Sequence, residues 1–198
     1  MKYSLKIQFF GGRGQTYESF IGSGGGGGGS VMNSEDIDLP ARMNKLFNGN
    51  KMSFEHTLDV FRDAHAFDKK QEHGILMDEN GFVNFYVHGE AHSVFLTMRN
   101  EEVRNEKITK DKIAVHNHPS NSFYSKADLR NFSVSPVSAT VVVGRTQDYI
   151  LKKNKNFEKS SQKFYNYINR HSYNEIQKFL SKAENQKKYG FSYSVRKH

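Results

Sequence analysis

The sequence contains no cysteine among its 198 residues, so it offers neither a disulfide framework nor a cysteine-ligated metal. A metal ion would have to be held by histidine, aspartate or glutamate side chains. No apolar run approaches the roughly 20 residues that cross a bilayer, and the chain begins without the apolar segment of a secretory signal. We therefore predict no membrane span and, by default, a cytoplasmic protein.

The length allows one domain with its own core and shorter appendages. The formal net charge of +8 favours an acidic partner, but the charge is unevenly distributed. Residues 152–198 contain twelve lysines and arginines against three glutamates, or +9, which leaves 17 basic and 18 acidic residues, or −1, in the rest. The basic character therefore belongs to the C-terminal segment.

Residues 1–38 are predicted to form a flexible tail. The stretch 24–29 is six consecutive glycines, which have no side chains to offset the entropy of ordering. A phosphate-binding loop is disfavoured, because no Gly-Lys-Ser/Thr follows and no apolar strand precedes it. The stretch 9–14, FFGGRG, resembles the N-termini of virion-associated proteins from phages of Gram-positive hosts. That resemblance implies a virion-associated location in a bacterial host as an alternative.

Residues 39–153 show a mixed pattern of helical and strand periodicity. Phe54, Leu58 and Phe61 recur at helical spacing after a Ser53 cap, and an Asn80-Gly81 turn separates two strand-like runs. The predicted helices cover 53–67 and 125–132, and the predicted strands cover 72–78, 82–87, 93–98, 113–115, 138–143 and 149–151, with a charged crossover at 99–112. These elements predict an α/β fold with a mixed central sheet flanked by helices.

Residues 154–198 are predicted to form a long basic amphipathic helix and a tail. Its apolar face comprises Phe157, Phe164, Ile168, Ile176, Phe179, Leu180 and Ala183, with lysines on the other side. One interpretation is a nucleic-acid or other acidic-partner surface, with lysines on phosphates and tyrosines at 165, 167, 173, 189 and 193 for stacking. The other is a structural helix that covers the sheet with a solvated lysine face. The continuity of the apolar face favours the structural interpretation.

The stretch 113–129, IAVHNHPSNSFYSKADL, carries the chemistry. His116 and His118 are two apart on a predicted strand and so point to one face, while Asn117 points to the other. Pro119 ends the strand, and Asp128 adds an oxygen ligand from the first turn of the next helix. A hydrolytic zinc site needs three protein ligands and one open position for water. The sequence therefore predicts a Zn²⁺ site.

Ser125 stands three residues before Asp128, where a helix cap is expected. Its hydroxyl either caps the backbone N–H of Asp128 or donates to the oxyanion of a tetrahedral intermediate, and both roles are compatible. His73, His88 and His92 are disfavoured as further ligands, because histidines near strand ends are usually solvated or hydrogen-bonded. His56 and His65 are assigned to the first helix.

The pattern His116-x-His118, loop, Ser125-x-x-Asp128 resembles the JAMM (MPN+) zinc-hydrolase motif. The stretch His-Asn-His-Pro-Ser is similar to the corresponding sequence in RadC-type proteins. The resemblance extends over about 72–153 and implies the cytidine-deaminase-like α/β sandwich of JAMM/MPN domains. It also implies hydrolysis of a peptide or isopeptide bond in a protein or peptide substrate. The loop before Ser125 has six residues where the family usually has seven, which we treat as a loop variant that affects the orientation of Ser125.

The resemblance also calls for a glutamate general base from an earlier strand. Glu72 is our choice, because Glu-His-Gly-Ile-Leu resembles the family's Glu-x-x-Gly-x-Leu stretch with one residue fewer; Glu90 is the second candidate. The main rival function is a RadC-like or virion-associated nucleic-acid-binding protein with a structural or vestigial zinc site. A metal-free MPN-like interaction module is disfavoured by the ligands present. Oligomeric state and substrate identity stay open.

Overall fold

The computed structural model of the chain describes residues 9–10, 53–88, 93–94 and 110–198. Its elements in chain order are β1 (Phe9–Phe10), α3 (Phe54–His65), β2 (His73–Met77), β3 (Val83–His88), β4 (Ser93–Val94), β5 (Ile113–Asn117), α5 (Lys126–Val134), β6 (Ala139–Val143), β7 (Gln147–Lys153), η1 (Glu158–Ser160), α6 (Ser161–Arg170), α7 (Tyr173–Ser181), α8 (Ala183–Tyr189) and β8 (Phe191–Lys197). The predicted tail apart from β1, most of the strand predicted at 93–98 and nearly all of the crossover lie outside the described residues.

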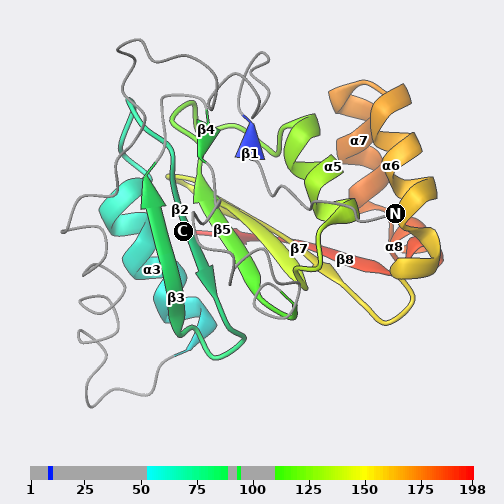
Figure 1. Ribbon diagram of the computed structural model, residues 1–198. Helices are drawn as coiled ribbons and strands as arrows, with labels where there is room; N and C mark the ends of the chain where they lie inside the picture. The colour runs from blue at the N-terminus through cyan, green and yellow to red at the C-terminus, as the bar shows by residue number, and fades with distance from the viewer. Residues whose placement is uncertain (1–8, 11–52, 89–92, 95–109) are drawn as a thin grey trace, which may run out of the picture.

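A six-stranded mixed sheet with the order β3-β2-β5-β6-β7-β8 organises the described part of the chain. Among the described strands, only β5 and β6 pair in parallel, and α5 lies between them in sequence. Figure 1 shows α3 on one side of this sheet and α5 to α8 toward the other. The short strands β1 and β4 pair antiparallel and form a separate two-stranded sheet. The predicted mixed α/β class is confirmed at this level.

Strand alternation divides the core into two clusters, one on each face of the sheet. The cluster on the α3 face includes Leu58 and Phe61 from α3 with Val115 from β5 and Val141 from β6. On the other face, Val142 of β6 belongs to a second cluster, together with Leu129, Phe132, Phe157, Phe164, Ile168, Ile176, Phe179, Leu180 and Phe191. The site described below lies on this second face.

The predicted hairpin forms between β2 and β3. Asp78 Oδ1 accepts hydrogen bonds from the backbone N–H groups of Asn80 and Phe82. Gly81 has φ of +84°, and a Cβ there would lie 2.5 Å from the Ser53 carbonyl oxygen, so glycine is required at this position. The Thr57 hydroxyl of α3 donates to the Gly81 carbonyl at 2.7 Å and joins helix to turn.

The C-terminal segment differs from the single long helix that we predicted. It forms the short 3-10 helix η1, three short α-helices and then β8, which pairs antiparallel with β7 at the edge of the sheet. Ser172 and Glu175 form a capping box that begins α7 after α6 has ended, and Gly190 ends α8 at φ of +76°. The predicted apolar face is buried except for Ala183, which is exposed.

A polar cluster joins β8 to α3 on the first face. Asp148 of β7 is buried, and its carboxylate lies 2.8 Å from Arg196 Nη2, 3.1 Å from His198 Nε2 and 3.6 Å from Arg62 Nη1. Asp59 of α3 pairs with both arginines, at 2.6 Å and 2.8 Å. Charges of both signs are therefore matched here. Among the described helices, none combines the length and apolarity of a membrane-spanning helix.

Candidate metal centre

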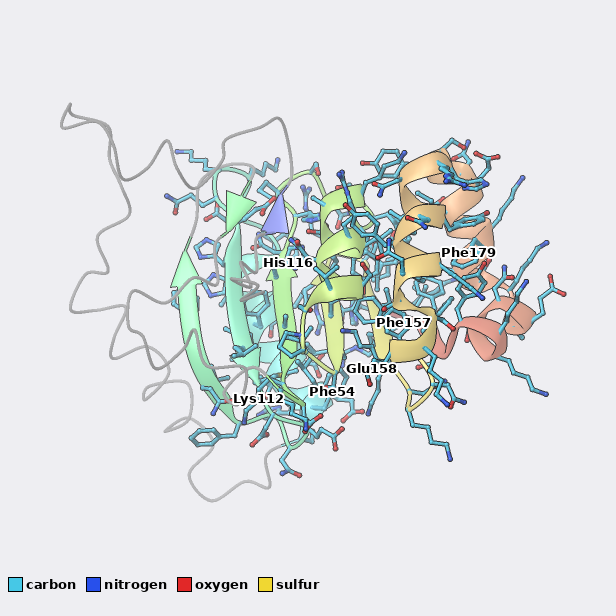
Figure 2. All side chains as sticks on the ribbon, turned by 45° about the vertical axis from the view of Figure 1, so that its right-hand side comes forward. Phe54, Lys112, His116, Phe157, Glu158 and Phe179 are labelled. Carbon is cyan, nitrogen blue, oxygen red and sulfur yellow. The ribbon has the colours of Figure 1, made fainter. Side chains whose placement is uncertain are left out.

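Three predicted ligands meet on the second face of the sheet. His116 comes from β5, His118 follows the strand, and Asp128 lies in the first turn of α5. All three are buried, and one ligand atom from each lies within 4.8 Å of the others. In Figure 2, His116 lies on β5 beside α5. The strand spacing and the helix start thus place together residues that the sequence separates by twelve positions.

The distances between these atoms suit a small metal ion. His116 Nε2 and His118 Nε2 are 3.0 Å apart, and they lie 3.6 Å and 3.3 Å from the nearer oxygens of Asp128. Donor atoms around a tetrahedral zinc ion, each about 2.0–2.1 Å from it, are about 3.3–3.4 Å from one another. The described residues therefore fit a tetrahedral ion in both ligand type and spacing.

Hydrogen bonding orients one of the imidazoles. His118 Nδ1 lies 3.2 Å from the Ser122 carbonyl oxygen, which accepts only, so this nitrogen carries the proton. In the neutral ring, His118 Nε2 then directs a lone pair toward His116 and the Asp128 carboxylate. Because such a buried group of acceptors is stable only around a proton or a cation, the arrangement favours cation binding.

The charges within the group are coupled. Burial lowers the pKa of His116, and Asp128 offsets this only in part. Burial also lowers the pKa of His118, but the hydrogen bond and charge of Asp128, together with the charge of Glu72, outweigh it and raise the pKa. Burial raises the pKa of Asp128, but the two imidazoles outweigh it and hold the pKa below its usual range. Asp128 is therefore an anion, as a metal ligand must be.

The start of α5 fixes the Asp128 side chain. The Ser125 backbone N–H donates to Asp128 Oδ2 at 2.7 Å, and the Asp128 N–H donates to Ser125 Oγ at 3.1 Å. This capping box confirms the structural role predicted for Ser125. Oδ1 accepts no hydrogen bond from a described residue and faces His116. Helix capping thus holds the carboxylate with Oδ1 toward His116 and Oδ2 toward His118.

A cavity of about 410 Å³ opens beside this group. Its lining comprises Glu72, His118, Pro119, Ser120, Ser122, Phe123, Tyr124, Ser125, Tyr173 and Gln177. The two predicted catalytic residues and one predicted ligand therefore border one space. Glu72 immediately precedes β2 and is only 2% exposed. The Ser125 hydroxyl accepts from Asp128 and has no acceptor for its own proton among the described residues.

Sequence reasoning missed the contribution of α7 to this cavity. Tyr173 and Gln177 are four residues apart and so share one side of the helix, while Ile176 and Phe179 pack into the core. The Ser172–Glu175 capping box was the available signal for a separate α7. Nothing in the sequence indicated which strand ends this helix would approach.

The other candidate residues lie elsewhere. Glu90 and His92 are outside the described residues, and so is the His88 side chain. The His73 ring lies 2.7 Å from the Tyr86 hydroxyl and 2.8 Å from Asp68, and stacks on His65 at 4.1 Å between ring centroids. Burial, with the nearby charge of His73, lowers the pKa of His65 to about 3. His73 therefore belongs to a separate hydrogen-bonded group.

No protein-family model matches the chain, and a search of curated proteins finds no match either.

Proposed function

We propose that the protein is a zinc-dependent amide-bond hydrolase of JAMM type, a peptidase or isopeptidase with the cytidine-deaminase-like sandwich of that family. The observation that carries the proposal is the buried His116, His118 and Asp128 group beside a cavity that Glu72 and Ser125 line. A ligand group with no acid–base residue beside it would favour a structural metal site, whereas this one adjoins open space with a carboxylate and a hydroxyl.

The three ligands would hold the ion through two imidazole nitrogens and a carboxylate oxygen. A bound zinc ion supplies Lewis acidity, which lowers the pKa of a coordinated water to about 7 and polarises a substrate carbonyl. The capping hydrogen bond from the Ser125 N–H and the His118 contact with Ser122 keep ligand atoms directed at one point.

Glu72 and Ser125 would perform the proton and charge chemistry. As water adds to the amide carbonyl, the Glu72 carboxylate accepts a proton from it and later gives this proton to the leaving nitrogen. The C–N bond then breaks to leave a carboxylic acid and an amine. The Ser125 hydroxyl, which has a proton to donate, would stabilise the negative charge that develops on the carbonyl oxygen.

Metal analysis of the purified full chain is the first test. We expect about one equivalent of zinc, either as purified or after zinc is supplied. Less than about half an equivalent under both conditions would overturn the proposal. Hydrolysis is then measured on a pool of fluorescence-quenched peptides and on a lysine isopeptide, and we expect cleavage of one of them that stops when a chelator removes the metal.

A second function rests on a separate observation, the exposed lysines of the C-terminal segment. Lys159, Lys163, Lys187 and Lys188 are all exposed. In this alternative, the chain is a RadC-like or virion-associated nucleic-acid-binding protein whose zinc is structural. Because β8 belongs to the sheet, charge reversal of these lysines is a cleaner test than truncation. The alternative predicts DNA binding that weakens with salt and disappears in the reversed variant. A cytoplasmic or virion-associated location stays a prediction.

A further inference from the structure

Asn117, the residue between the two histidine ligands, is buried on the α3 face of β5. Its Oδ1 accepts a hydrogen bond from the His73 backbone N–H at 2.6 Å. Its Nδ2 donates to the carbonyls of His65 at 3.0 Å and Gln71 at 3.3 Å. One side-chain amide thus joins the ligand strand to three backbone groups that lie between 44 and 52 residues earlier in the chain.

Two of these groups flank Glu72 directly. The Gln71 carbonyl belongs to the peptide unit before Glu72, and the His73 N–H belongs to the unit after it. The backbone ladder between β2 and β5 ends at the pair Gly74 and His116. The Asn117 amide therefore continues the pairing by side chain, and it restrains the backbone on both sides of Glu72 relative to the strand that carries the ligands.

The third hydrogen bond anchors this arrangement to a rigid element. His65 is the last residue of α3, which packs into the first core cluster through Leu58 and Phe61. Asparagine suits the position because it offers one acceptor and two donors in a single plane. Aspartate keeps the acceptor and loses both donors, and an apolar residue leaves three buried or part-buried backbone groups without this partner.

We propose that Asn117 is a positioning residue that holds the Glu72 carboxylate in place relative to the His116, His118 and Asp128 group. This inference rests on the proposed function, in which Glu72 is the general base. General bases act within hydrogen-bond reach, and a displacement of about 1 Å can cost roughly 100-fold in rate. A side chain on the opposite face of the sheet thus fixes the position of the Glu72 carboxylate relative to the metal ligands.

The test compares Asn117→Ala with Thr57→Val in the full chain. The control also removes a buried side-chain hydrogen bond on the α3 face, from Thr57 to Gly81, but in the hairpin turn. We expect both variants to lose stability and to bind one equivalent of zinc. Only Asn117→Ala should lower kcat, by roughly 10- to 100-fold, while KM changes less than about twofold.

A second readout does not need hydrolysis. Cobalt(II) replaces zinc in tetrahedral sites, and its paramagnetic shift on the Glu72 side-chain resonances depends on their position relative to the metal. We expect this shift to change in Asn117→Ala and to stay constant in Thr57→Val. Faster amide hydrogen exchange at His73 should accompany the change. Where Asn117→Ala does not fold, Asn117→Asp serves in its place, with the same expected directions.

The outcomes separate the two proposals. An active wild-type enzyme whose kcat and Glu72 shift are unchanged in a folded Asn117 variant overturns the positioning role and leaves the proposed function standing. A wild-type chain that binds cobalt and hydrolyses nothing overturns the proposed function, whereas an Asn117-dependent Glu72 shift in that chain still supports the positioning role. A wild-type chain that binds neither zinc nor cobalt overturns both the proposed function and the positioning role.

Discussion

The same strands build both faces of the sheet, but the buried polar side chains on the two faces have different kinds of partner. On the α3 face, the buried Asp148 carboxylate is matched by Arg62, Arg196 and His198. On the opposite face, the nitrogen and oxygen atoms of His116, His118 and Asp128 converge on one point. The first arrangement supplies the opposing charges from within the chain, and the second leaves room for a cation from outside.

The difference shows how one strand serves both stability and chemistry. Alternation along β5 sends Val115 and Asn117 toward α3 and His116 toward α5. Buried polar groups that are fully partnered stabilise a unique fold, whereas an incomplete group costs stability until its ligand binds. We therefore expect substitutions on the α3 face to change stability and substitutions around the ligands to change activity. Asn117, on the α3 face, should affect both.

The largest expected loss of hydrolysis rate comes from Glu72→Gln, on the second face. Removal of a general base typically costs about 10²- to 10⁴-fold in rate, and glutamine keeps the size of the side chain. Zinc content should not change, because Glu72 is not among the ligands. His118→Ala should lose both zinc and activity, while Glu79→Gln, at an exposed turn, should lose neither.

Kinetics and metal analysis on the same preparations check this. An active Glu72→Gln variant would contradict the assignment, and Glu90→Gln then becomes the variant to measure.

Asp148→Ala tests the first face and should destabilise the protein by about 3 kcal/mol. Loss of one partner from a buried ion-pair group leaves the others without compensation. Asp59 still pairs with both arginines, which keeps the cost below that of an isolated buried charge. Urea unfolding measures the loss, and kcat of the folded variant should stay within about twofold of wild type. A large fall in kcat at unchanged stability would show that the two faces are not separable in this way.

The parts of the fold that sequence predicted are those in which local rules act over short stretches. The hairpin follows from Asn80-Gly81, because φ at Gly81 is positive. The ligand group follows from strand alternation at His116 and His118 and from the Ser125-x-x-Asp128 cap. Each of these depends on residues within a few positions of one another.

The C-terminal segment was mispredicted because its apolar periodicity continues across a helix break. Phe164, Ile168 and Ile176 follow helical spacing on both sides of Ser172, where the capping box begins a new helix. Phe191 and Tyr193 alternate with serines, which is a strand pattern, but the prediction included these residues in the helix and tail. The partners of Asn117 were beyond sequence reasoning for another reason, since they lie more than forty residues away.

Lys153 tests how much a buried positive charge on the second face lowers the free energy of unfolding. Its ammonium donates to the Ser135 carbonyl and lies 5.0 Å and 5.3 Å from the ring centroids of Phe132 and Phe157. Burial lowers its pKa from 10.5 to about 8. Between these values the unfolded chain binds more protons than the folded chain, so the free energy of unfolding rises with pH.

At about 1.4 kcal/mol per pKa unit, the rise should reach about 2 kcal/mol between pH 8 and 9.5. Higher pH is avoided because burial raises the pKa of Tyr193 to about 12, which gives the opposite trend above pH 10. Urea unfolding of wild type and Lys153→Met across this range isolates the contribution of the lysine. If the free energies of unfolding of the two proteins changed in parallel with pH, Lys153 would not be the source of the rise.

The smallest effect concerns Tyr173, which lies 52% exposed on α7 at the edge of the cavity. A substrate seated against Glu72 and Ser125 would cover this ring, so Tyr173→Ala should raise KM roughly five- to tenfold, as loss of about 1 kcal/mol of aromatic contact does. Because Tyr173 is not one of the three metal ligands, zinc content and kcat should be unchanged. Phe67→Ala, which removes a 65% exposed ring that is not part of the cavity lining, is the matched control. Equal KM values for the two variants would mean that substrate does not reach α7, and that the segment serves the sheet alone.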